Sequence, residues 1–206
     1  MHIYAFGSIC RGEIDLGSDV DLLACVSGPA IEIDREKYSV YQYASLKNLW
    51  EKGNPFAWHL HIESKMIFSP DGADFIASLG EPEPYRSVAL DLQKFQRLFE
   101  NSYQALKVSE SSGVFHLSCI FLAIRNFATC HSLAIGKPVF SRRSPLLIDC
   151  VLDIDATVFS TLVRARILST RGLGRVISSD EAVRAVAELK MIPDWMGEIW
   201  SQHRND

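Results

Sequence analysis

Two short groups of residues near the N-terminus have the types and spacing needed for phosphate chemistry. Gly7-Ser8 follows the apolar run His2–Phe6, and Asp19-Val20-Asp21 opens the next apolar run after a Gly-rich turn. A glycine lets a backbone N–H approach a phosphate oxygen closely, and the serine adds a hydroxyl. Residues two apart in a strand lie on one face, so the two carboxylates would stand side by side. Such a pair attracts Mg²⁺, which prefers one or two protein carboxylates together with substrate phosphates.

This arrangement resembles the signature of the DNA polymerase β-like nucleotidyltransferase superfamily, in which Gly-Ser, a turn of roughly ten residues and Asp-x-Asp follow one another. The likeness is to the small bacterial members, the minimal and aminoglycoside nucleotidyltransferases, and extends over roughly residues 1 to 80. It implies transfer of a nucleoside monophosphate from a nucleoside triphosphate, with ATP the expected donor. The acceptor is unidentified: a small molecule, a tRNA or a protein.

The resemblance also implies roles for individual residues. Asp19 and Asp21 would be catalytic residues that bind the metal, and two Mg²⁺ ions are expected in such sites. The residues expected to bind the nucleotide lie in the turn between the two strands and just before it: Gly7, Ser8, Arg11 and Ser18.

Active members of the superfamily add a third carboxylate on a neighbouring strand, but the expected strand here, Tyr38–Tyr43, contains no acid. Glu63 is a candidate catalytic residue in its place, and Glu32 and Asp34 are alternatives just before the tyrosine-rich run. If none of them completes the site, the chain would be a catalytically reduced nucleotide-binding protein or a regulatory protein of the toxin–antitoxin type.

His59 and His61 accompany Glu63 in a segment, Trp58–Phe68, that is predicted to be a strand. Alternation would place the three side chains on one face. Two imidazoles and a carboxylate could bind Zn²⁺, but zinc sites normally need a further ligand, and none is evident nearby. We therefore interpret the histidines as half-buried side chains near the nucleotide cleft.

The apolar pattern predicts an α+β fold. A small mixed nucleotidyltransferase sheet with flanking helices would occupy residues 1–82, and an all-α helical bundle residues 83–206 that binds substrate or a partner. The boundary lies in Gly80–Pro84, where closely spaced prolines disfavour both helix and central strand. The predicted strands are His2–Phe6, Val20–Val26, Tyr38–Tyr43 and Trp58–Phe68, and the predicted helices Ser45–Lys52, with Ser45 as N-cap, and Asp71–Leu79.

The second half shows helical periodicity over Val88–Leu106, Gly113–Ile135, Leu146–Leu168 and Ser179–Leu189, the last with Ser179 or Asp180 as N-cap. Arg125 and His131 resemble the Arg-x(4 to 6)-His motif of HEPN domains, helical modules that include ribonucleases. An offset of about 240° puts the two residues on different faces of a straight helix, which favours a structural or substrate-orienting Arg125. They are candidates for an acceptor site or a second site.

Composition limits the remaining classes of function. With 48% hydrophobic and 22% charged residues the chain should fold as a globule, and a net charge of −4 argues against coating of DNA by the whole surface. Five scattered cysteines favour a reduced protein. No secretory signal or membrane span is evident, so we expect a cytoplasmic protein without a membrane partner. The superfamily usually has a helix before the Gly-Ser strand, and the fold here is either trimmed or packed against another subunit, as in a homo-oligomer.

Overall fold

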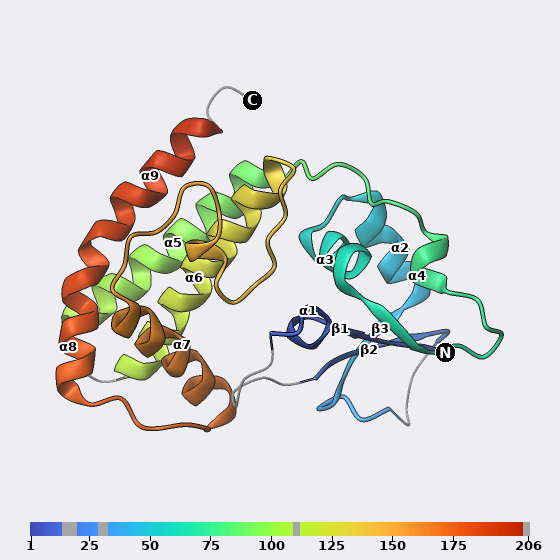
Figure 1. Cartoon of the computed structure of the whole chain (residues 1–206), viewed down its shortest axis with the longest axis horizontal. Helices are drawn as coiled ribbons and strands as arrows, with labels where there is room; N and C mark the ends of the chain where they lie inside the picture. Colours follow the sequence, from blue (N-terminus) through green and yellow to red (C-terminus); the bar gives the residue numbers. More distant parts are fainter. Residues whose placement is uncertain (14–19, 29–32, 109–111, 204–206) are drawn as a thin grey trace. The chain divides into compact units, whose positions relative to one another are not determined.

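The computed structural model describes residues 1–13, 20–28, 33–108 and 112–203. The chain divides into two units, Met1–Ser87 and Val88–Asp206. In Figure 1 the first unit contains a sheet with short helices, and the second contains helices. The predicted α+β class is confirmed.

A mixed sheet organises the N-terminal unit. Within the described residues its strand order is β3-β2-β1-β4. Strand β1 pairs antiparallel with both β2 and β4, whereas β2 and β3 are parallel. The strands are β1 (His2–Phe6), β2 (Asp21–Val26), β3 (Tyr38–Gln42) and β4 (Lys65–Phe68). Because β1 and β2 are central and Phe6 pairs with Asp21, the described motif residues Gly7, Ser8 and Asp21 lie at one end of the middle of the sheet.

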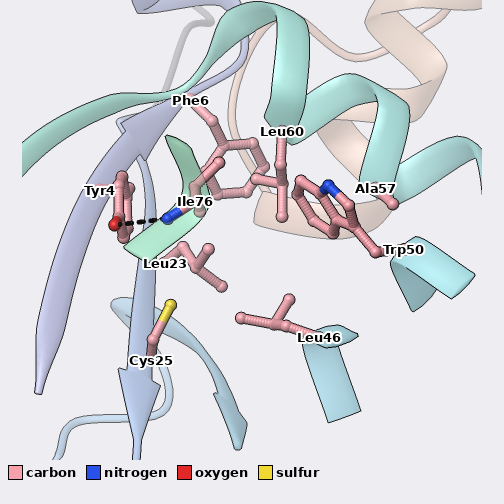
Figure 2. Close-up of a cluster of buried hydrophobic side chains, with 9 residues drawn as sticks. All are labelled: Tyr4, Phe6, Leu23, Cys25, Leu46, Trp50, Ala57, Leu60 and Ile76. Atoms are coloured by element: carbon pink, nitrogen blue, oxygen red, sulfur yellow. Dashed lines mark hydrogen bonds between the residues drawn. The ribbon is translucent and has the colours of Figure 1, made fainter. Parts of the chain in front are cut away.

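The core of this unit joins one face of the sheet to its helices, which are α1 (Ser8–Arg11), α2 (Tyr43–Glu51), α3 (Pro55–Glu63) and α4 (Phe75–Ser78). Alternate residues of β1 and β2 supply the strand side of the core, and the helices supply the other side: Tyr4, Phe6, Leu23, Cys25, Leu46, Trp50, Ala57, Leu60 and Ile76. Figure 2 shows the Tyr4 hydroxyl reaching the backbone N–H of Ile76, a bond of 3.1 Å. Helix α4 is thereby fastened to β1.

The prediction of one strand over Trp58–Phe68 is wrong. Most of that segment is helix α3, and only Lys65–Phe68 forms strand β4. The helix starts because the Asn54 side chain caps it, accepting from the Phe56 N–H, and because Pro55 fits the first helical position. The predicted common face of the two histidines and the glutamate is therefore wrong too.

Two predicted helices in this unit begin at other residues. Helix α2 starts at Tyr43 with Gln42 at the N-cap, so Ser45 does not cap it. Helix α4 is shorter than the predicted Asp71–Leu79, because Asp74 accepts from the Ala77 N–H and starts the helix there.

The segment Gly80–Pro84 is irregular, as predicted, but it stays packed on the N-terminal unit. The Trp50 indole N–H donates to the Gly80 carbonyl (2.9 Å), and the Glu83 N–H donates to the Trp50 carbonyl (3.0 Å). These bonds tie the segment to the end of α2, which is why the division of the chain falls after it.

The C-terminal unit is helical in its described residues. Its long helices are α5 (Val88–Val108), α6 (Gly113–Ala134) and α7 (Ala156–Arg171), followed by α8 (Ser179–Glu188) and α9 (Ile192–Gln202), with 3-10 turns η1 (Ser144–Leu146) and η2 (Leu189–Met191). Helix α6 packs against both α5 and α7. It is long and apolar enough to cross a membrane, but more than half of its most apolar window is buried inside the protein, as in the central helix of a bundle.

Two helix starts differ from the prediction here as well. The helix predicted from Leu146 begins only at Ala156, because Asp155 caps it by accepting from the N–H groups of Thr157 and Val158. Helix α8 is capped by Ser178, one residue before the predicted N-cap positions, and Glu181 completes a capping box with it.

Candidate functional site

Strand β1 ends in a tight turn at Gly7, close to the start of β2. Gly7 follows Phe6 with φ +76°, and α1 begins at Ser8. The register pairs Phe6 with Asp21, so the first residue of β2 lies at the same end of the sheet as the turn. Ser18, Asp19 and Glu32, which belong to the predicted site, lie outside the described residues.

Gly7 and Asp21 are in direct contact. A Cβ added to Gly7 would lie 2.4 Å from Oδ2 of Asp21, a separation that real Cβ atoms do not reach. The left-handed φ also disfavours any other residue at this position. The sequence prediction that Gly7-Ser8 and Asp21 belong to one site therefore agrees with the geometry of the turn.

Asp21 also borders a hollow of about 460 Å³ between the beginnings of β2 and β3. The same hollow is lined by Arg35, Lys37 and the aromatic residue Tyr38. Glu36 lines the hollow as well, and Lys37 pairs with Asp34 at 3.2 Å, so the lining carries both acidic and basic side chains. Sequence analysis did not single out Arg35, Lys37 or Tyr38, although a basic pair just before the tyrosine-rich strand was a usable signal.

The neighbouring strand β3 supplies no carboxylate. Its register pairs Leu23 with Ser39 and Cys25 with Tyr41, so Ser39 and Tyr41 share the face of Asp21. Asp34, one of the alternatives for the third acid, is exposed and stabilises the turn in which it lies. It accepts from the Glu36 N–H at 3.0 Å and pairs with Lys37 at 3.2 Å, and these contacts keep its pKa below the usual range.

Glu63 ends helix α3 and is nearly buried, with a side chain 10% exposed. Its Oε2 accepts from Nε2 of His59, one helical turn earlier, at 2.8 Å and pairs with the guanidinium of Arg11. Arg11 bonds Glu13 as well, at 3.0 Å. His61, by contrast, is exposed. The structure thus joins two predicted site residues, Arg11 and Glu63, to each other.

A cation would meet oxygen donors of the right kind at Asp21. Its carboxylate stands against the glycine of the turn, where phosphate oxygens could approach the backbone, and hard oxygen ligands are those Mg²⁺ requires. The described residues hold no group of three or more His, Cys, Asp or Glu side chains placed for a metal ion.

Residues 2–81 match the family model of the nucleotidyltransferase domain. The N-terminal unit is a nucleotidyltransferase domain. The match spans β1 to the segment after α4 and includes the whole described site. It confirms the superfamily to which the Gly-Ser and Asp-x-Asp pattern pointed, and it supports nucleotidyl transfer as the general chemistry of the domain. A search of the curated proteins found no match.

Outside the nucleotidyltransferase domain, His131 is fully buried in the helical unit. Its Nε2 bonds Oδ1 of Asp149 and its Nδ1 bonds Nε2 of His203, both at 2.9 Å. The hydrogen bond from His131 holds the pKa of Asp149 below its usual range. RNA cleavage would require an accessible imidazole, whereas this one links α6 to the α6–α7 connection and to the end of α9.

Arg125, the other candidate of the helical unit, lies on α6 and is half-buried. Its backbone carbonyl accepts a hydrogen bond of 2.9 Å from the hydroxyl of Ser144 in η1. An acceptor-binding role for its side chain stays a prediction.

Proposed function

We propose that the protein is a Mg²⁺-dependent nucleotidyltransferase that uses a nucleoside triphosphate, with ATP the first candidate, to modify a hydroxyl-bearing acceptor. The observation that carries the proposal is the contact between Gly7 and the Asp21 carboxylate, because a carboxylate against a glycine turn could hold a metal ion beside bound phosphates. The family match of residues 2–81 supports the same chemistry.

Each of the site residues would have its own role in the reaction. The Gly7-Ser8 turn would bind the phosphates, and Asp21, with Asp19, would hold Mg²⁺. When bound, Mg²⁺ neutralises phosphate charge and orients the phosphates. Arg35 and Lys37, which line the hollow beside Asp21, would add positive charge.

The transfer itself is a displacement at phosphorus. The acceptor oxygen bonds to the α-phosphorus while the bond to the β-phosphate bridging oxygen breaks, pyrophosphate leaves, and the acceptor proton passes to solvent or a base. The acceptor would be a small molecule, a tRNA or a protein.

A turnover assay tests this proposal. The full-length protein is incubated with Mg²⁺ and each α-labelled nucleoside triphosphate, with candidate acceptors, and label transfer and pyrophosphate release are measured. Asp21→Asn should lower the rate on the order of a thousandfold, because it removes the negative ligand that would hold Mg²⁺ against the transferring phosphate. Asp194→Asn, an exposed carboxylate on α9, is the matched control. Equal rates for the wild type and Asp21→Asn would contradict the proposal.

A catalytically reduced, nucleotide-binding regulator, for example of the toxin–antitoxin type, is the second candidate. Two observations favour it: β3 carries no acid, and Glu63 is already paired with Arg11 and His59. Saturable nucleotide binding with no turnover on any acceptor would select this function. Turnover abolished by Asp21→Asn would remove it.

A further inference from the structure

Glu63 sits on the side of β1 opposite to Asp21. Lys65, two residues later, pairs with Ala5 of β1, and antiparallel pairing carries Glu63 toward the end of β1 where Gly7 begins. Asp21 approaches the same turn from β2. The two carboxylates therefore approach the Gly7-Ser8 turn from its two sides, Asp21 from the start of β2 and Glu63 from the end of α3, just before β4.

Arg11 is the link between Glu63 and that turn. It is the last residue of α1, the single helical turn that starts at Ser8, and its side chain is 19% exposed. Its guanidinium pairs with Glu63 on one side and with Glu13 on the other. A planar guanidinium held by two carboxylates has a fixed orientation, so the backbone that carries it is restrained as well.

His59 fixes Glu63 in turn. The imidazole is 14% exposed, donates to Glu63, and meets the ring of Phe6 edge to face at a centroid distance of 5.6 Å. Phe6 belongs to the core and immediately precedes Gly7. The chain of contacts from His59 through Glu63 to Arg11 thus rests on the packed core at one end and on α1 at the other.

We propose that Glu63 is a positioning residue that holds Arg11, and through it the Gly7-Ser8 turn, in the conformation that receives a triphosphate. The proposal rests on the proposed function for its substrate. This role takes the place of the third metal ligand that the sequence predicted for Glu63. The Arg11 guanidinium already pairs with the Glu63 carboxylate, and its positive charge would repel an incoming Mg²⁺.

The first arm of the test needs no nucleotide. Hydrogen exchange over residues 7–13 is compared in full-length wild type, Glu63→Gln and Arg11→Lys, with exchange over α6 reporting that each variant is folded. Both variants should exchange about tenfold faster over residues 7–13. Glu51→Gln, an exposed acid at the end of α2, is the matched control and should not change the exchange. Unchanged exchange in Glu63→Gln would overturn the proposal.

The second arm separates positioning from metal binding. Binding of a non-hydrolysable ATP analogue is measured while Mg²⁺ is varied. Positioning predicts about tenfold weaker analogue binding in Glu63→Gln with an unchanged Mg²⁺ midpoint, and His59→Gln should weaken binding more than the exposed-site control His61→Gln. A Mg²⁺ midpoint that rises in Glu63→Gln, with normal exchange, would show a metal ligand and overturn the proposal. If the wild type binds no analogue, the proposed function fails, and the exchange arm still decides whether Glu63 holds the turn.

Discussion

At Gly7, the backbone conformation and the contact with the Asp21 carboxylate both depend on the absence of a side chain. The residue has φ +76°, in the region that glycine adopts most readily, and Oδ2 of Asp21 occupies the space that a Cβ would need. The carboxylate can approach the turn only because a side chain is absent. The position of Asp21 therefore requires a glycine at residue 7, independently of any role in binding phosphate.

Gly7→Ala should lower label transfer by at least about a hundredfold, because the added methyl group must displace the Asp21 carboxylate or the turn. Gly12→Ala is the matched control: φ is +73° there, but nothing lies within 4 Å of the added Cβ. Both variants bear a backbone strain of about 1–2 kcal/mol, and only the first disturbs Asp21. Transfer rates and unfolding midpoints of both variants are compared. An equal loss of activity in the two would show that strain, and not the contact with Asp21, is responsible.

The sequence pattern predicted only some of the contacts seen at the candidate site. Gly7, Ser8 and Asp21 were predictable because each lies at a strand end within one hairpin-like connection, and strand pairing brings them together. The pairing of Arg11 with Glu63 was not predictable, since the two are far apart in the sequence and meet only after α3 has packed on the sheet. Glu63 was singled out, but for a role as metal ligand derived from a strand that does not exist.

Among the elements, helix α3 shows why an apolar, aromatic segment can be misassigned. The alternation of His and aliphatic residues from Trp58 onward is typical of a strand. The same residues fit a helix equally well once the residues before Trp58 are taken into account. Asn54 and Pro55 are a strong start signal, and His59 and Glu63 have the spacing of one helical turn. Strands β1 to β3 and helices α5 and α6 were predictable because their apolar periodicity is consistent.

Helix α8 begins with a capping box whose glutamate is also ion-paired. Glu181 accepts from the Ser178 backbone N–H and pairs with Arg164 and Arg175, and these contacts, the first most of all, lower the pKa of Glu181 to about 2. A carboxyl whose pKa is lowered on folding stabilises the protein above its ordinary pKa. That stabilisation is lost as the pH falls through the folded-state value.

The unfolding midpoint should therefore drop between about pH 5 and about pH 2, and Glu181→Gln should lose part of this dependence. At pH 7 the same variant should melt a few degrees lower, because it loses its ion pairs and weakens the capping box. Glu188→Gln, at the other end of α8, should be neutral or stabilising, since a negative charge opposes the helix dipole there. Circular dichroism melts across this pH range are the measurement. A wild-type acid profile in Glu181→Gln would contradict the prediction.

At the scale of the whole molecule, the chain consists of two units, Met1–Ser87 and Val88–Asp206. The described site lies in the first unit, within the residues that match the nucleotidyltransferase family. The second unit is built around the buried helix α6, whose His131 connects Asp149 and His203 inside the unit. These contacts give His131 a structural role in the helical unit, and the nucleotidyltransferase site supplies the proposed activity.

Direct observation of a divalent cation shared between Asp21 and a nucleotide tests the central claim. Mn²⁺, used in place of Mg²⁺, is followed by electron paramagnetic resonance in the full-length protein with and without a non-hydrolysable ATP analogue. The account predicts tight Mn²⁺ binding only with the analogue, weakened at least about tenfold in Asp21→Asn and unchanged in Asp194→Asn. Binding that does not depend on the analogue, or that persists in Asp21→Asn, would contradict it.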